Sequence, residues 1–214
     1  ELFKMLTGPR PVMAMELLMN TGAMHYVIPE FDASFDMTQN EYHSGTVWEH
    51  TLAVLKGVAG NSIEICFAAL LHDIGKTVTR TESEGKVHFI EHETAGAEIA
   101  ETVMRRLHCS NEFIKKVSFL IRHHMDVKPY GSFAEKMKPK RLRRLMYLCE
   151  TEEFFRDLMT LVDADNKAHS EAHAMPMQVA EIIRKMEAMK AEGSDMFGYK
   201  LPLTGADIME IKGI

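Results

Sequence analysis

Histidine and aspartate residues group together in this chain of 214 residues, which contains 11 histidines. His72 and Asp73 stand side by side at the end of the apolar run CFAALLHDIGK. A carboxylate in apolar surroundings is costly to bury unless a partner compensates its charge, and a divalent cation supplies that compensation. Imidazole nitrogen and carboxylate oxygen suit Mn, Fe, Ni, Zn or Co better than metals that prefer thiolate. The pair therefore predicts a metal site, in which the two oxygens of Asp73 could bridge two ions.

His50 is a second candidate, because helical periodicity turns it toward the core. In the segment VWEHTLAVLKGV, Val47, Val54 and Val58 form an apolar stripe, and His50 falls on the same face together with Thr51. A single inward histidine is usually a hydrogen-bonded core residue. The neighbouring His-Asp pair is what favours a ligand role here.

A late aspartate completes the candidate set. In FFRDLMTLVDADNKAH, the apolar stripe that starts at Phe154 and ends at Ala168 includes Asp165. Asp163 falls instead on the face that carries Arg156. We therefore expect Asp165, and not Asp163, to be the ligand.

Two more histidines lie on segments with helical periodicity. His124 ends NEFIKKVSFLIRHHM and shares a face with Val117 and Leu120, whereas the adjacent His123 is expected to face solvent. His92 opens the helical segment HETAGAEIAETVMRRL. Of the adjacent residues His123 and His124, the second is therefore the better candidate for facing the core.

The segments that position these residues are typical of helices joined by loops, because Gly and Pro are sparse inside the apolar segments and frequent between them. Only residues 77–81 and 86–90, on either side of a Glu-Gly turn, alternate like a small hairpin. The predicted fold class is all-α. Asn111 and Thr204 are expected as helix N-caps. Helices are predicted over residues 12–20, 47–59, 63–72, 92–107, 111–124, 140–148, 152–169 and 179–192, with a short one after residue 204.

The charge balance argues against a dedicated nucleic-acid binder, because the formal net charge is -6. One local run, KMKPKRLRR at residues 136–144, has the opposite sign. Two interpretations remain open for it: a solvated helix start, or a contact with the phosphate backbone of an RNA such as tRNA. The cations of the run are Lys136, Lys138, Lys140, Arg141, Arg143 and Arg144.

The three cysteines predict a reducing compartment. Cys66, Cys109 and Cys149 are far apart and form no CxxC motif, so we expect free thiols and a cytoplasmic protein. No stretch reaches the roughly 20 apolar residues of a membrane span, and the first residues, ELFKMLTGPR, lack the layout of a signal peptide. We therefore expect no membrane partner.

The ordered set His50, His72, Asp73 and Asp165, with the string HDIGK intact, resembles the HD superfamily of metal-dependent phosphohydrolases. The resemblance implies a helical bundle that holds one divalent ion on these four side chains. It spans more than 110 residues of sequence, which makes it far more specific than the HDIG string alone.

His92 and His124 resemble the additional ligands of the HD subset that binds two metals. The resemblance implies that Asp73 bridges the first ion to a second one held by these histidines. One or two ions chosen from Mn, Ni, Mg, Fe, Co and Zn are therefore the expected cofactors.

The flanking strings narrow the resemblance. YHSGTVWEHTLAVL, FAALLHDIGKTVTRT, VHFIEHETAGAEIAE and IRHHM are similar to the C-terminal HD region of bacterial tRNA nucleotidyltransferases and poly(A) polymerases. LLMNTGAMHYVIPEF looks like the neck before that region, and LPLTGADIMEI looks like its closing stretch. The expected divisions are a helical neck-like segment at 1–40, an HD domain at 41–175 and a helical extension at 176–214. Both ends look cut, and the Gly-rich nucleotidyl-transfer site of that family has no counterpart.

The resemblance implies hydrolysis of a phosphomonoester or a 2′,3′-cyclic phosphodiester, with Asp73 and Lys76 in catalytic roles. Lys76 could instead be a charge at the helix C-terminus that Gly75 is expected to end. Arg80, on the hairpin, is a further candidate for binding the phosphate. In the basic run, Lys138, Lys140 and Arg141 are the candidate substrate contacts.

Three functions remain open at this point. The first is a catalytic HD domain that acts on nucleotides or RNA 3′ ends. The second is a module that positions tRNA around a mainly structural metal, and the third is a free-standing nucleotide phosphohydrolase. His43 and His88 are expected either to line the pocket or to occupy the surface. No constellation includes the other histidines, which are expected to be structural or exposed: His25, His108, His169 and His173.

Overall fold

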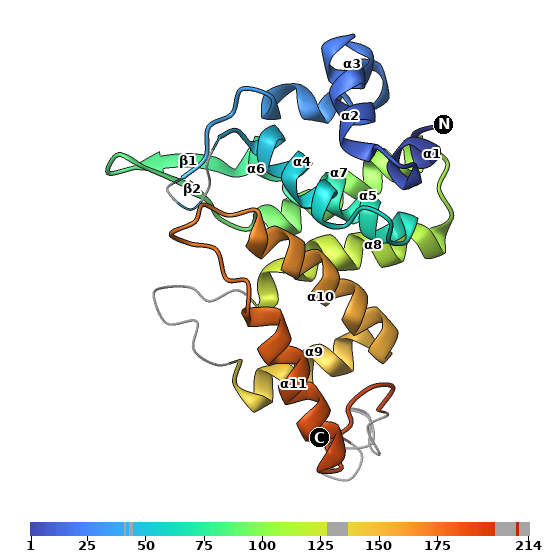
Figure 1. Ribbon diagram of the computed structural model, residues 1–214, viewed down its shortest axis with the longest axis vertical. Helices are drawn as coiled ribbons and strands as arrows, with labels where there is room; N and C mark the ends of the chain where they lie inside the picture. Colours follow the sequence, from blue (N-terminus) through green and yellow to red (C-terminus); the bar gives the residue numbers. More distant parts are fainter. Residues whose placement is uncertain (41, 43–44, 128–136, 200–208, 210–214) are drawn as a thin grey trace.

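The computed structural model describes residues 1–40, 42, 45–127, 137–199 and 209. The predicted all-α class is confirmed, because the described part contains eleven α-helices and one two-stranded antiparallel sheet (Figure 1). The helices are α1 (Leu2–Thr7), α2 (Pro11–Asn20), α3 (Ala23–Val27), α4 (Val47–Gly57), α5 (Ile63–Leu71), α6 (Lys76–Thr79), α7 (His92–Arg106), α8 (Asn111–His123), α9 (Pro139–Cys149), α10 (Glu152–Lys167) and α11 (Gln178–Ala191). The other elements are the 3-10 helices η1 (Pro29–Ser34) and η2 (His124–Val127) and the strands β1 (Arg80–Ser83) and β2 (Lys86–Phe89).

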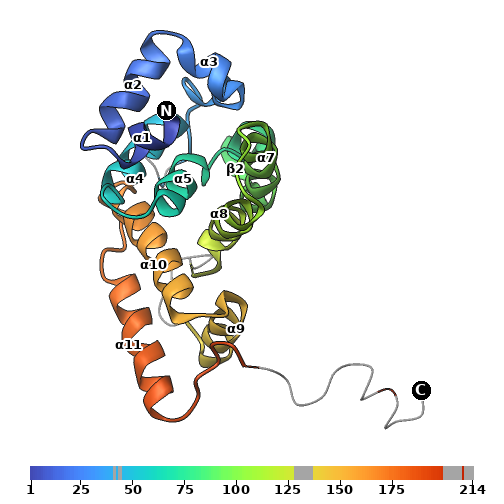
Figure 2. The ribbon, with the colours of Figure 1, turned by 90° about the vertical axis from the view of Figure 1, so that its right-hand side faces the viewer.

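The elements follow one another along the long axis of the molecule (Figures 1 and 2). Helices α1 to α3 lie at one end, α4 to α8 form the middle, and α9 and α11 lie at the other end. Helix α10 reaches from that end into the middle, where it packs on α4 and α5. This arrangement brings a late segment of the sequence against two early helices.

Side-chain caps fix where several helices begin. Thr46 forms a capping box with Glu49 at the start of α4, and Thr151 accepts a hydrogen bond from the Phe154 backbone N–H at the start of α10. The prediction of an Asn111 cap was wrong by one residue: Ser110 is the N-cap of α8. The predicted cap at Thr204, and the short helix expected after it, lie outside the described residues.

The predicted hairpin forms, but over a shorter range than expected. Its turn lies at Glu84 and Gly85, where φ is 53° and 72°. Residues 77–79 belong to helix α6 and not to the first strand. The hydroxyls of Thr77 and Thr79 donate to the carbonyls of Ile74 and Gly75, so these residues bond locally and do not join the ladder.

Gly75 does not end a helix, contrary to expectation. Helix α5 already ends at Leu71, and Gly75 has ordinary right-handed helical angles immediately before α6. Its lack of a side chain serves a close approach to α7. A Cβ atom here would lie 2.1 Å from the His92 carbonyl oxygen and 2.5 Å from the Gly96 nitrogen. This contact lets the turn that carries His72 and Asp73 lie against the start of α7.

The first 35 residues pack on the body of the fold and contain more helix than the sequence indicated. Only α2 was expected, whereas α1, α3 and η1 are also present. Helix α1 packs on α5, and α2 packs on α4. Arg106 at the end of α7 binds Glu30 through two hydrogen bonds of 2.8 Å. The pair links the N-terminal segment to α7.

All three cysteines are free, and Cys66 and Cys149 are buried. Burial, with a smaller contribution from Asp126, raises the pKa of Cys149 to about 12. Among the described residues, no helix combines the length and the apolar character that crossing a membrane requires.

Replacing Gly75 with alanine should destabilise the protein by about 3 kcal/mol or more, because backbone atoms of α7 block the new methyl group. Gly85→Ala is the control, since its positive φ costs about 1 kcal/mol but nothing lies within 4 Å of the added carbon. Urea unfolding followed by circular dichroism measures both. Equal losses in the two variants would contradict the close approach of α6 and α7.

Replacing Glu30 with glutamine should lower the free energy of unfolding by up to about 1 kcal/mol at pH 7, because the pair with Arg106 is partly exposed. The Arg106 guanidinium holds the pKa of Glu30 below its ordinary value of 4.5. The stabilisation is therefore complete above that value and is lost as the pH falls through the lower folded-state pKa. Thermal unfolding between pH 3 and pH 7 should show the two proteins converging only at the acid end. The exposed pair of Glu101 with Arg105 gives the control variant Glu101→Gln, which should change little.

Candidate metal centre

Six buried side chains from five parts of the fold converge between α4, α5, α7, α8 and α10. Each of them exposes between 0 and 6 % of its surface. Helix α4 supplies one histidine, the turn after α5 supplies the His-Asp pair, and α10 supplies the aspartate. The start of α7 and the start of η2, directly after α8, supply two more histidines. The six are His50, His72, Asp73, His92, His124 and Asp165.

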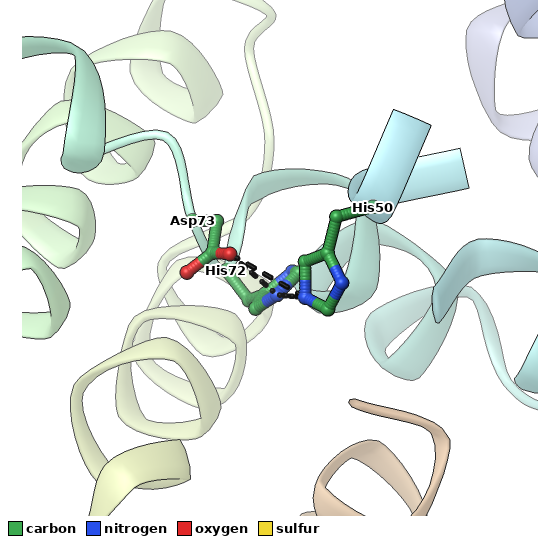
Figure 3. A group of neighbouring side chains, drawn as sticks. All are labelled: His50, His72 and Asp73. Atoms are coloured by element: carbon green, nitrogen blue, oxygen red, sulfur yellow. Dashed lines mark hydrogen bonds and ion pairs between the residues drawn. The ribbon is translucent and has the colours of Figure 1, made fainter. Parts of the chain in front are cut away.

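The first group surrounds Oδ2 of Asp73, and Figure 3 shows three of its side chains pointing toward one another. His72 Nε2 lies 3.2 Å and His50 Nε2 lies 3.5 Å from this oxygen. Asp165 Oδ1 lies 3.1 Å from His50 Nε2. The ligand atoms of His50, His72 and Asp73 all lie within 4.8 Å of one another, so the group could hold a metal ion.

The second group uses the other oxygen of the same carboxylate. Asp73 Oδ1 lies 3.3 Å from His92 Nε2, and His124 completes the group. The ligand atoms of these three residues also lie within 4.8 Å of one another. One carboxylate thus belongs to two candidate ligand groups, one on each oxygen.

Backbone carbonyls orient three of the histidine rings. Nδ1 of His72 donates to the Ala69 carbonyl at 2.9 Å, and Nδ1 of His92 donates to the Phe89 carbonyl at the same distance. Nδ1 of His124 donates to the carbonyl three residues earlier at 2.6 Å. A carbonyl only accepts, so Nδ1 carries a proton in each ring and Nε2 is the atom that faces the centre. Nε2 of His92 is buried and lies 3.3 Å from Asp73 Oδ1, a position that fits a metal ligand.

The electrostatic setting also fits a cation. Burial opposes ionisation of Asp73, but the positive charges of His72 and Lys76 hold the pKa of this carboxyl well below its ordinary value. Burial lowers the pKa of His50 and lowers that of His124 much further, with His72 and His92 adding to the effect on His124. Burial also lowers the pKa of His72, but the carboxylates of Asp73 and Asp165 and the hydrogen bond to the Ala69 backbone together turn the net shift upward. The ionised carboxylate of Asp73 and the lowered pKa values of His50 and His124 favour the unprotonated ligands that metal binding requires.

Lys76 lies inside the site and not at a helix end. Its Nζ is 2.7 Å from Asp73 Oδ2 and 2.7 Å from Gln39 Oε1. The interpretation of Lys76 as a C-terminal helix charge was wrong, because this residue begins α6. It is 3 % exposed, so any phosphate that it contacts must enter the buried centre.

The two late aspartates have different surroundings. Asp165 is 1 % exposed and faces His50. Asp163 lies on the outer face of α10, where Lys167 binds it at 2.5 Å. The apolar stripe of the sequence therefore placed both side chains on the faces that they occupy.

His169 stands beside the centre, although the sequence assigned it to no constellation. Its Nδ1 donates to the Asp165 carbonyl at 2.8 Å, and its ring centroid is 5.7 Å from that of His50. The signal was the spacing of four residues between Asp165 and His169, which places both on one helical face. The helix was expected to reach His169 but ends at Lys167, and its C-cap Ala168 keeps right-handed helical angles.

The other predicted site residues are not among the six that converge. Arg80 is on β1 and pairs with Glu82 at 3.7 Å. Lys138, Lys140 and Arg141 line a cavity of about 600 Å³ beside the second ligand group. Lys136 and His43 lie outside the described residues. The remaining histidines have surface positions or local partners: His88 and His108 are exposed, His25 binds Asp32, and His173 lies against Ser170 and Tyr42.

The family model for the HD domain matches residues 41–165, which is more than half of the chain. The chain belongs to the HD domain family. HD domains bind divalent metals, and this HD domain contains two groups of buried side chains that could hold such ions. Residues 1–35 match a second model, described as the probable RNA and SrmB-binding site of polymerase A.

The curated relatives include tRNA nucleotidyltransferases and multifunctional CCA proteins. A CC-adding tRNA nucleotidyltransferase of Thermus thermophilus is 28% identical over 100% of this chain and 47% of its own length. A multifunctional CCA protein of Halorhodospira halophila is 31% identical over 72% of this chain and 40% of its own length. An A-adding tRNA nucleotidyltransferase of Deinococcus radiodurans is 24% identical over 100% of this chain and 49% of its own length. The chain thus spans about half the length of these relatives, and the resemblance to tRNA nucleotidyltransferases and poly(A) polymerases is confirmed.

Replacing Asp165 with alanine should weaken binding of Mn²⁺ or Ni²⁺ by more than about tenfold, because it removes a buried carboxylate that lies 3.1 Å from His50 Nε2. Asp163→Ala is the matched control on the same helix and should leave the affinity unchanged, since its partner is Lys167. Isothermal titration calorimetry on the metal-stripped proteins measures both affinities. Loss of metal in the Asp163 variant alone would reverse the assignment.

Proposed function

We propose that this chain is a metal-dependent phosphohydrolase domain, acting as a phosphatase or a 2′,3′-cyclic phosphodiesterase, of a protein related to tRNA nucleotidyltransferases. The observation that carries the proposal is the carboxylate of Asp73, which belongs to both ligand groups. An HD domain that served only as a scaffold would have no need of a second group of buried histidines. We also propose that the protein works in the cytoplasm, where its cysteines would stay as free thiols.

The proposed residue roles follow from the distances. His50, His72, Asp73 and Asp165 would hold one ion, and Asp73 with the other two histidines would hold a second. Bound divalent ions polarise phosphoryl oxygens and lower the pKa of a bound water toward 7. The backbone carbonyls that bind Nδ1 of His72, His92 and His124 hold these three rings with Nε2 toward the centre, where it could bind an ion.

Lys76 is proposed to neutralise charge next to the reacting phosphate. Its ammonium group already contacts Asp73 Oδ2, so it lies within the ligand groups. Gln39 and the ring of Phe89, 5.3 Å from Nζ, hold it in that position. Arg80 is exposed on the hairpin and could contact a part of the substrate that projects outward.

The proposed substrates are a nucleotide or the phosphate at an RNA 3′ end, and tRNA is a candidate through the basic run at 136–144. The match of residues 1–35 to an RNA-binding family supports RNA as the partner. The same match favours the second candidate function, a module that positions tRNA around a mainly structural metal. The two differ in one respect: only the first requires that metal-loaded protein hydrolyses phosphate esters.

Replacing Asp73 with alanine should abolish metal-dependent hydrolysis, a loss larger than the roughly 100-fold that removal of a supporting partner costs. The physical reason is that both ligand groups lose their shared oxygens. Activity is measured on p-nitrophenyl phosphate and on nucleoside 2′,3′-cyclic phosphates with added Mn²⁺, Ni²⁺ or Mg²⁺. Asp163→Ala serves as the control, and circular dichroism checks that each variant folds. Full activity in the folded Asp73 variant would rule out the catalytic function and leave the tRNA-positioning module.

A further inference from the structure

A basic cavity adjoins the second ligand group. One wall comes from α9 and the other from the start of α7 and the end of α8, and the cavity volume is about 600 Å³. Its cations come from two separate elements, since α8 contributes one arginine and the basic run at 136–144 contributes the rest. They are Arg122, Lys138, Lys140, Arg141 and Arg144.

The charge balance of this cavity is opposite to that of the whole chain. Five cations face two carboxylates, Glu93 and Asp126, in a chain of net charge -6. Asp126 is bound by His123 at 2.8 Å, and Glu93 lies 3.5 Å from His92 Nδ1. Among the residues that the structure describes, none of these five lining cations forms an ion pair. The cavity therefore carries uncompensated positive charge that a polyanion could neutralise.

Helix α9 presents its cations selectively. Arg141, Arg144, Leu145 and Leu148 recur at three- and four-residue spacing and line the cavity, whereas Arg143 does not. Four buried apolar residues of α9, including Leu142, fix the rotation of the helix on the core. The sequence left the basic run open between a solvated helix start and a phosphate contact. The structure separates cations that face the cavity from one that does not.

The cavity lies next to the more accessible side of the metal centre. In the wall formed by α7 and α8, Glu93 and Thr94 directly follow His92, and His123 directly precedes His124. Among the six candidate ligands, His92 has the largest exposed fraction, 6 % against 0 to 2 % for the others. A phosphate at the second ligand group would therefore have its neighbouring phosphates on the side of the cations.

We propose that this cavity binds the phosphates that precede the reacting phosphate of an RNA strand. The substrate of the metal centre is then the end of a phosphodiester chain and not an isolated nucleotide. This inference rests on the proposed hydrolytic function and specifies its substrate class. Arg141 and Arg144, together with Arg122, bind the strand, while the six buried residues act on its terminal phosphate.

The test compares two substrates with the same reacting group. One is a short single-stranded oligoribonucleotide that ends in a 2′,3′-cyclic phosphate, and the other is adenosine 2′,3′-cyclic phosphate. The double variant Arg141→Gln with Arg144→Gln is compared with Arg105→Gln with Arg184→Gln, which removes the same charge from exposed sites outside the cavity and the basic run. Asp73→Ala protein controls for a contaminating nuclease.

The cavity variant should lose at least tenfold in kcat/KM on the oligoribonucleotide and keep its rate on the mononucleotide, because charge-assisted contacts to phosphate are lost only with the longer substrate. For binding of the oligoribonucleotide, the slope of the logarithm of the binding constant against the logarithm of salt concentration should also become smaller in magnitude by about 1.4. This corresponds to about 0.7 for each phosphate contact removed. The control variant should match the unmodified protein on both substrates.

Two results would overturn the proposal: equal effects of the two double variants, or equal loss on both substrates. Failure of the unmodified, metal-loaded protein to hydrolyse either substrate would contradict the proposed function instead. The cavity is then tested by fluorescence anisotropy with the same oligoribonucleotide. Unchanged affinity in the cavity variant would remove the strand-binding assignment as well.

Discussion

Asp73 carries its negative charge in surroundings where only 2 % of its surface reaches solvent, and burial alone would raise the pKa of its carboxyl group. An ionised carboxylate persists there only because positive charge and hydrogen bonds compensate it. Lys76, His72 and His92 supply that compensation from three directions. Each of these partners must itself be held in place, so the need to balance one charge constrains the turn after α5, helix α6 and the start of α7 together.

The same type of backbone hydrogen bond orients three of the histidine rings. Each of His72, His92 and His124 donates from Nδ1 to the carbonyl three residues earlier, although the first follows a helix, the second begins one and the third begins a 3-10 helix. The rings are thus oriented by their own chain segments and need no second side chain. Gly75 completes the arrangement, because only a residue without a Cβ lets the turn approach the first residues of α7 this closely. The site therefore depends on main-chain contacts as much as on the ligands themselves.

Sequence reasoning was strongest where a single periodic face decided the outcome. The stripe on α10 placed Asp165 inward and Asp163 outward, and the apolar runs gave the interior helices to within a few residues. It failed where local hydrogen bonds competed with a pattern, as at Thr77 and Thr79, and where a contact between distant segments set the conformation, as at Gly75. The cavity beside α9 could not be predicted from the sequence. Arg122 lies near the cations of the basic run only because α8 packs against later segments.

The separation of His50 and Asp165 along the chain has a consequence of its own. These two residues are 115 positions apart, yet their side chains lie 3.1 Å from each other. A cation held between them would act as a cross-link that closes a very long loop, and such closures restrict the unfolded chain more than short ones do. Binding or release of the ion would then change how firmly α4 is held against α10. The metal supply and the mechanical integrity of the domain would therefore be linked.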